Sequence, residues 1–164
     1  MKLSKYFTLA EMVKSDMAIR WGIDNIPTEE QIENLKALCI NCLDKIRDYF
    51  GPVRINSGFR CLKLNTKIKG DKKSQHMKAE AGDFEVDNYT NDHVWNWIVT
   101  ESDIDFDQCI AEFIGSHGTD GWIHVSYSRK RKNRNLITIA SKVDGKTVYK
   151  NYTKEQIING EYSF

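Results

Sequence analysis

The segment SQHMKAEAGDF, residues 74–84, places His76 just before a strand and Asp83 within it. From Glu80 onward polar and apolar residues alternate, so that Phe84 lies on one side and Asp83 on the other. This period of two predicts a strand with one polar face. The lysine-rich stretch before it predicts an exposed loop that ends at His76.

A second histidine lies farther along the chain, in WIHVSY, residues 122–127. Ile123 and Val125 share the face that we expect to enter the core, so His124 faces the opposite side. With the earlier histidine and aspartate it offers two imidazoles and one carboxylate. Such a set leaves a fourth position for water, as a catalytic zinc ion requires. Spacing alone does not decide the matter, because a strand histidine is more often an ordinary surface group.

Helices precede strands along most of the chain. Thr8 and Glu11 form a capping box that begins a short helix, and Thr28 and Gln31 form another that begins a helix over residues 28–50. The segment 53–60 is expected to start as a short strand and to turn at Ser57 and Gly58, and residues 62–69 to form a helical turn. Further predicted elements are a strand at 80–86, a helix at 90–100, an antiparallel hairpin from 108–113 and 122–127, a solvated basic turn at 128–134, a second hairpin about Asp144 and Gly145, and a short C-terminal helix. This order predicts an α+β fold, with a small antiparallel sheet packed against the N-terminal helices.

Composition indicates one globular domain. The chain has 164 residues, 40% of them hydrophobic and 29% charged, with a net charge of +1, so nothing in the overall charge favours a nucleic-acid partner. We expect a single domain over residues 1–164, with a core at about 5–128 and a C-terminal hairpin extension at about 135–150. No stretch reaches the roughly 20 apolar residues that span a bilayer, and the N-terminus lacks the apolar run of a secretory signal. We expect a monomer.

The cysteines are expected to be reduced, since no secretory signal is evident. Cys39 and Cys42 form a CxxC pair, but no second pair follows at zinc-site spacing. Both fall on the apolar stripe of the predicted helix 28–50, which favours a place in the core.

Three motifs together resemble the zinc D-alanyl-D-alanine peptidases, a group that includes bacterial dipeptidases and carboxypeptidases, phage endolysins and the hedgehog fold. SQHMKAEAGDF is similar to the S-x-H-x-x-G-x-A-x-D signature, NSGFRC (56–61) to an S-G-Y-R element, and WIHVSY to a W-x-H element. FTLAEMVKSDMAIRWGIDN (7–25) resembles the opening of the phage and prophage branch. The resemblance extends to about Tyr127, and it implies a hedgehog-like peptidase fold.

The resemblance also implies roles for individual residues. His76, Asp83 and His124 match the zinc ligands, and Ser74 matches a serine that contacts substrate. Arg60 matches an arginine that steadies the scissile carbonyl or a substrate carboxylate. The sequence departs from the signature at two small residues: Ala79 stands where glycine is common, which leaves the turn after His76 open, and Gly82 stands where alanine is common.

A zinc peptidase also needs a carboxylate that takes a proton from the attacking water. Branches that resemble this one read E-F-G-x-W-x-H, which maps Glu112 onto that role, with an enlarged turn before Trp122. Asp120, in the glycine-rich tip of the hairpin, is the alternative. Trp122 shares its strand face with His124, so we expect it at the rim of the substrate cleft.

These observations predict a zinc metallopeptidase of the D-Ala-D-Ala carboxypeptidase or peptidoglycan endopeptidase type, acting on D-alanine-containing wall peptides. A phage or prophage lysis factor is one setting. It would be made in the cytoplasm and reach the wall after release or export. The alternatives are a non-catalytic zinc-containing module that binds cell wall and a virion structural component. One further surface could dock an anionic wall polymer: the basic run of Arg129, Lys130, Arg131, Lys132 and Arg134.

Overall fold

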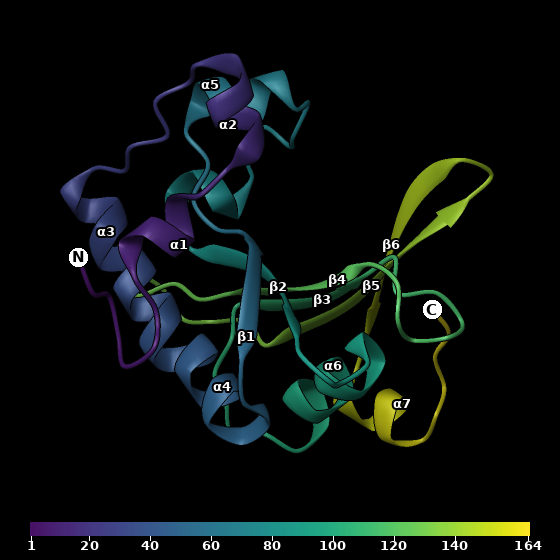
Figure 1. Cartoon of the computed structure of the whole chain (residues 1–164). Coiled ribbons are helices and arrows are strands. Elements are labelled where there is room, and N and C mark those ends of the chain that lie inside the picture. Colours follow the sequence, from purple (N-terminus) through teal and green to yellow (C-terminus); the bar gives the residue numbers. More distant parts are fainter.

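The computed structural model describes all residues from Met1 to Phe164. Two short helices open the chain (Figure 1). The first, α1 (Leu9–Val13), begins at the predicted capping box, in which Thr8 and Glu11 bond each other's backbone N–H groups. The second, α2 (Asp16–Trp21), was not predicted; it ends at Gly22, whose φ of 58° is the left-handed conformation that glycine tolerates.

A long helical rod follows and confirms the prediction for residues 28–50. It consists of α3 (Glu29–Leu38), the π-helical segment η1 (Cys39–Leu43) and α4 (Asp44–Phe50). Gly51 ends it, as expected. Cys39 and Cys42 are free thiols with no exposed surface, which confirms that they belong to the core.

Six strands form one sheet in the order β1-β2-β4-β3-β5-β6. Their bounds are β1 Val53–Ser57, β2 Ala81–Val86, β3 Gln108–Glu112, β4 Trp122–Ser126, β5 Leu136–Val143 and β6 Lys146–Tyr152. The remaining helical elements are α5 Leu62–Lys67, η2 Gln75–Lys78, α6 Asn91–Thr100 and α7 Lys154–Ile158. All strand pairs are antiparallel except β3 and β5, which run parallel. The α+β prediction is confirmed.

One face of the sheet carries the hydrophobic core. Phe84, Ile123 and Val125 point into a single buried cluster with Leu38 of α3 and Trp95 of α6. The alternate residues of the same strands point to the opposite face. The central strands therefore hold a packed side under the helices and leave the other side free for polar groups.

The basic segment 128–134 is not the solvated hairpin turn that we predicted. Because β5 pairs with β3 and not with β4, this segment crosses the end of β3 to reach β5. Backbone bonds fix its end against the residues before β3: the Asn135 N–H donates to the Phe106 carbonyl at 2.9 Å, and the Leu136 N–H to the Asp107 carbonyl at 3.0 Å.

The final hairpin, β5 and β6, turns at Asp144 and Gly145, as predicted. Both residues have positive φ, 50° and 76°, which is the backbone of a tight hairpin turn. Figure 1 shows the tip of this hairpin projecting beyond the rest of the sheet. None of the helices combines the length and the apolar character that crossing a bilayer requires.

Candidate active site

Cross-strand pairing brings the candidate ligands together. In the register of the sheet Asp83 of β2 lies opposite His124 of β4, and Ser57 of β1 lies opposite Asp83. These residues alternate with core residues, so their side chains project from the face that the helices leave uncovered. A one-residue change of register would turn Asp83 into the core.

His76 reaches the same point from η2, the turn of helix just before β2. Its ring is 3% exposed. Nδ1 lies 2.7 Å from the Gly58 carbonyl oxygen, and because a carbonyl only accepts, Nδ1 carries the proton and Nε2 keeps its lone pair. That Nε2 lies 3.2 Å from Oδ1 of Asp83.

His124 approaches the same carboxylate oxygen from the other side, with Nδ1 2.8 Å from Oδ1 of Asp83. Its other nitrogen, Nε2, is buried without a hydrogen-bond partner. Burial raises the pKa of Asp83, but the two histidines outweigh that effect and hold the pKa of this carboxyl well below its usual range. Asp83 is therefore a buried carboxylate anion between two imidazoles.

The geometry of these three residues fits a zinc ion. Their ligand atoms lie within 4.8 Å of one another. Ligands about 2.0–2.1 Å from a tetrahedral zinc lie about 3.3 Å apart, and the two nitrogens lie 3.2 and 2.8 Å from the shared oxygen. A bound cation would also account for the burial of a carboxylate and two imidazoles in one small volume.

Gly58, the glycine of the NSGFRC motif, orients His76 through its carbonyl oxygen, a role that the motif alone did not predict. A Cβ at Gly58 would lie 2.3 Å from the Met12 carbonyl oxygen, so only glycine allows the loop after β1 to approach α1 this closely. The Phe59 N–H donates to the same oxygen at 2.7 Å. This contact fixes the Gly58 carbonyl that in turn orients the His76 ring.

The turn after His76 keeps a glycine-like conformation although Ala79 occupies it. Ala79 ends η2 with φ 58° and ψ 31° in the left-handed region. This backbone costs an L-residue roughly 1–2 kcal/mol. Ala79 thus adopts the left-handed backbone that glycine favours at such a position.

Glu112 and Asp120, the two candidate bases, lie in different surroundings. Glu112 ends β3, opposite Trp122 and one strand from His124, and lines the cleft above Asp83. Burial, and then the charge of Asp83, raise the pKa of Glu112 to about 7. Asp120 is an exposed residue of the connection between β3 and β4 and does not line the cleft.

Arg60 and Ser74 lie together on the wall opposite β3. Nη2 of Arg60 lies 3.4 Å from Oγ of Ser74, and Nε of Arg60 is buried without a partner. Burial lowers the pKa of Arg60, while Asp83 and Glu112 oppose that shift. Trp122 lies at the rim, where its ring packs edge-on against Phe113, and its Nε1 is buried without a partner.

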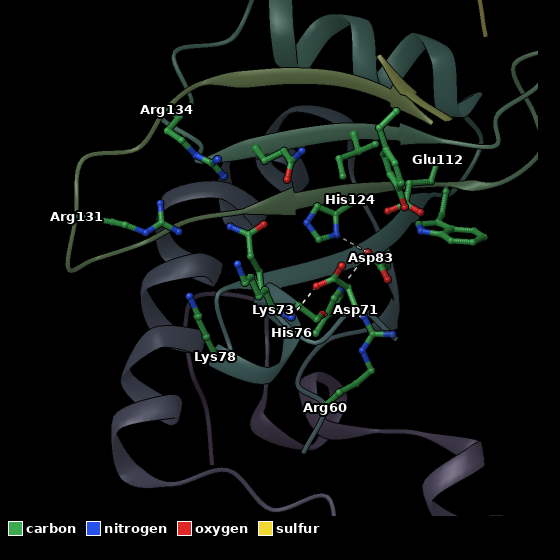
Figure 2. Close-up of a pocket in the computed structure, with 16 residues that line it drawn as sticks. Arg60, Asp71, Lys73, His76, Lys78, Asp83, Glu112, His124, Arg131 and Arg134 are labelled. Atoms are coloured by element: carbon green, nitrogen blue, oxygen red, sulfur yellow. Dashed lines mark hydrogen bonds and ion pairs between the residues drawn. The ribbon is translucent and has the colours of Figure 1, made fainter. Parts of the chain in front are cut away.

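The cleft has a volume of about 730 Å³. Figure 2 shows Glu112 near one end, Arg131 and Arg134 at the other, and His124 and Asp83 between them. The sequence did not predict that Gln75, Gln108 and Tyr149 of β6 line the cleft. Arg131 and Arg134 also line it, although the sequence assigned them to a solvated turn. In the sheet Ala140 lies opposite Glu112, and Tyr149 lies opposite Ala140. Because the side chain of Ala140 is small, Tyr149 reaches the cleft.

A family comparison agrees with this geometry. The family model described as peptidase M15 matches residues 5–126, which include every one of the candidate ligands. The chain belongs to the peptidase M15 family. Its members are zinc-dependent metallopeptidases, so the chain is placed among the hydrolases that act on peptide bonds. No curated protein matches the sequence significantly.

The M15 match ends at Ser126, the last residue of β4. It therefore includes β1 to β4, with Asp83, Glu112 and His124 on the last three of them, and His76 of η2. The crossing segment and the β5–β6 hairpin lie outside it. Arg131, Arg134 and Tyr149 thus line the cleft from residues outside the M15 match.

Proposed function

We propose that this M15 protein hydrolyses D-alanine-containing stem or cross-link peptides of peptidoglycan, with zinc held by His76, Asp83 and His124. One observation carries the proposal: two imidazole nitrogens converge on one carboxylate oxygen, in a cleft that a half-buried glutamate also lines. When bound, zinc supplies an acidified water and a Lewis acid for the scissile carbonyl.

Glu112 is the proposed general base. Its carboxylate lies on the cleft side of the sheet, in the row next to His124, and its pKa of about 7 matches the pH at which a proton must be both taken and returned. It removes the proton of the attacking water and delivers it to the leaving amine. Asp120 is exposed and does not line the cleft, which favours Glu112 for this role.

Arg60 and Ser74 are the proposed substrate contacts beside the reacting bond. The guanidinium of Arg60 is partly desolvated, which strengthens its interaction with negative charge on the carbonyl oxygen. Ser74 holds that guanidinium at 3.4 Å. Trp122 closes the rim on the side of Glu112.

The direct test is digestion of isolated sacculi by the purified protein, with and without a chelator, followed by mass analysis of the released fragments. We expect peptides cut at D-alanine, no product in the chelator, and recovery on addition of zinc. The masses also separate carboxypeptidase from endopeptidase action. Absence of a chelator-sensitive product from walls of several chemistries contradicts the proposal and favours the non-catalytic wall-binding module, which a sedimentation assay with the same sacculi detects.

We further propose that the setting is the lysis of a bacterial host by a phage or prophage, because residues 7–25 resemble the opening of that branch. The third hypothesis, a component of the virion, predicts that antibodies find the protein in purified particles. A lysis factor is found instead in lysates and not in particles.

A further inference from the structure

The basic run after β4 is divided by the fold into two groups. Arg129 and Lys130 turn toward α3, where Nε of Arg129 donates to Oδ1 of Asn34 at 2.7 Å and Lys130 pairs with Glu30. Arg131 and Arg134 turn the other way and line the cleft. The run is therefore not one continuous surface for a polymer.

A single buried carboxylate holds the two cleft arginines. Asp107, which has no exposed surface, accepts from Nε and Nη2 of Arg134 at 3.0 and 2.6 Å. It also pairs with Arg131 and accepts from Gln75 at 2.8 Å. Two-point contacts of this kind fix the plane of a guanidinium, so Arg134 is held in one orientation before any ligand arrives.

Both arginines keep donors free for a ligand. Nη1 of Arg134 and Nε of Arg131 take part in no hydrogen bond within the protein, and the two side chains remain 41% and 54% exposed for Arg131 and Arg134 respectively. Glu80 makes a longer contact, 3.4 Å, with Arg131 only.

The opposite wall of this end is also cationic. Lys73 and Lys78 line it and form no ion pair within the protein. The one acidic group lining this end is Asp71, which accepts from the backbone N–H of Lys73. Asp107 and Glu80 behind the arginines neutralise part of their charge. With Asp71 they make three anionic groups against four cationic ones, and the free donors of the two arginines and the unpaired lysines face the ligand, which favours an anion.

The sheet sets how far this end lies from the reacting bond. Asp107 immediately precedes β3, and Ile110 of β3 lies opposite His124. Three residues of strand span about 10 Å, which is the length of about three residues of an extended peptide. A peptide carboxylate two or three residues from the scissile bond would therefore reach the arginine pair.

We propose that Arg131 and Arg134, fixed by Asp107, form a carboxylate-binding subsite that selects wall peptides with an acidic residue two or three positions from the scissile bond. This inference rests on the proposed peptidase function. The free α-carboxylate of the D-glutamyl residue in a stem peptide has the right chemistry, and amidation of that group removes the charge while keeping the shape.

The test compares two synthetic stem peptides that differ only in a free or an amidated glutamyl carboxylate. In Arg131→Gln, Arg134→Gln and the double variant, we expect KM for the acidic peptide to rise about 10- to 100-fold, as loss of a charge-assisted hydrogen bond implies. KM for the amidated peptide should change less than about threefold, and kcat should change little for either.

Lys130→Gln is the matched control, because it removes one positive charge from the same segment but not from the cleft. Damage to folding would reduce cleavage of both peptides alike, so equal losses for the two peptides overturn the proposal. Equal effects of Lys130→Gln and Arg134→Gln overturn it too.

Equilibrium binding of both fluorescently labelled peptides tests the subsite even where neither peptide is cut. A wild-type preference for the acidic peptide that Arg134→Gln abolishes supports the subsite. Equal affinities of the wild type for the two peptides refute it.

Discussion

The M15-matched part of the chain and the segment that follows it contribute to the cleft in opposite ways. His76, Asp83 and His124 are at most 9% exposed and are locked by neighbouring strands and by the Gly58 carbonyl. Arg131, Arg134 and Tyr149 come from residues after the match and are about half exposed. Buried side chains held in one conformation suit metal binding. Exposed side chains on a separate segment can be substituted without moving the three candidate ligands. On the roles proposed above, the reaction would depend on the matched part, and the segment after it would add a charge preference to the substrate contacts of Arg60, Ser74 and Trp122.

The largest effect should come from the ligand set. Asp83→Ala removes the oxygen that both histidines approach, so we expect loss of bound zinc and a fall in turnover of at least about 10³-fold. Metal content by elemental analysis and cleavage of sacculi measure the two effects. Arg134→Gln is the control from the other part and should retain full zinc. If Asp83→Ala still binds one zinc and cuts, the division between the two parts is wrong.

Glu112 should have the next largest effect. Glu112→Ala is expected to keep zinc but lose about 10²- to 10⁴-fold in kcat, because the proton transfer loses its base. Asp120→Ala, which removes a carboxylate from the exposed connection, should stay within about threefold of the wild type. The reverse result would transfer the role of base to Asp120.

Asp107 joins the two parts, so its replacement should affect stability and selectivity together. Asp107→Asn leaves two arginines without their anion, and we expect unfolding to become easier by about 2–3 kcal/mol near neutral pH, a moderate value because both arginines are partly exposed. Burial raises the pKa of Asp107, but Arg134 and Arg131 together lower it well below its usual range. A lowered folded-state pKa gives stability that is present above the unfolded pKa of about 4 and is lost as the pH falls below it.

Chemical denaturation between pH 7 and pH 2 measures that effect. The wild type should lose more stability than Asp107→Asn over the acidic half of this range, so the two curves should converge at low pH. Parallel curves would mean that Asp107 does not bind these arginines as an anion.

Two glycines of the matched part provide the smallest and most local comparison. Gly58→Ala forces a Cβ against the Met12 carbonyl, and we expect a loss of about 1–3 kcal/mol with weaker zinc binding through His76. At Gly82 a Cβ would meet Leu38, Leu43 and Met12 at 3.7–3.8 Å, which is ordinary contact. Gly82→Ala should therefore raise stability by about 0.4–1 kcal/mol. Thermal unfolding with and without zinc separates the two, and a destabilised Gly82→Ala variant would contradict the packing described for β2.

The sequence predicted those features that depend on neighbouring residues. The capping boxes at Thr8 and Thr28, the turn at Asp144 and the alternation around Asp83 all depend on residues a few positions apart, and each has the expected structure. The approach of His76, Asp83 and His124 to one another was expected from three ordered motifs and not from their spacing.

Features that depend on distant pairing could not be predicted in this way. Nothing near residue 136 indicates that β5 pairs with β3, so the crossing of residues 128–134 and the burial of Asp107 beneath two arginines remained hidden. Tyr149 lies in the cleft because β3 pairs with β5 and β5 with β6 in a register that aligns Glu112, Ala140 and Tyr149. Gly58 is constrained by Met12, a residue of another element.

The parallel pairing of β5 with β3 also protects the molecule from association. A chain cut back to the end of the M15 match would leave β3 as a free edge whose unpaired N–H and C=O groups invite strands of other molecules, and QCIAE is apolar enough to aggregate there. In the whole chain the outermost strand on that side is β6, which carries exposed Lys146 and Lys150. Charged side chains on an edge strand discourage such self-assembly. The β5–β6 hairpin thus covers the edge of β3 against pairing with strands of other molecules, and its lysines discourage such pairing at the outer edge of the sheet.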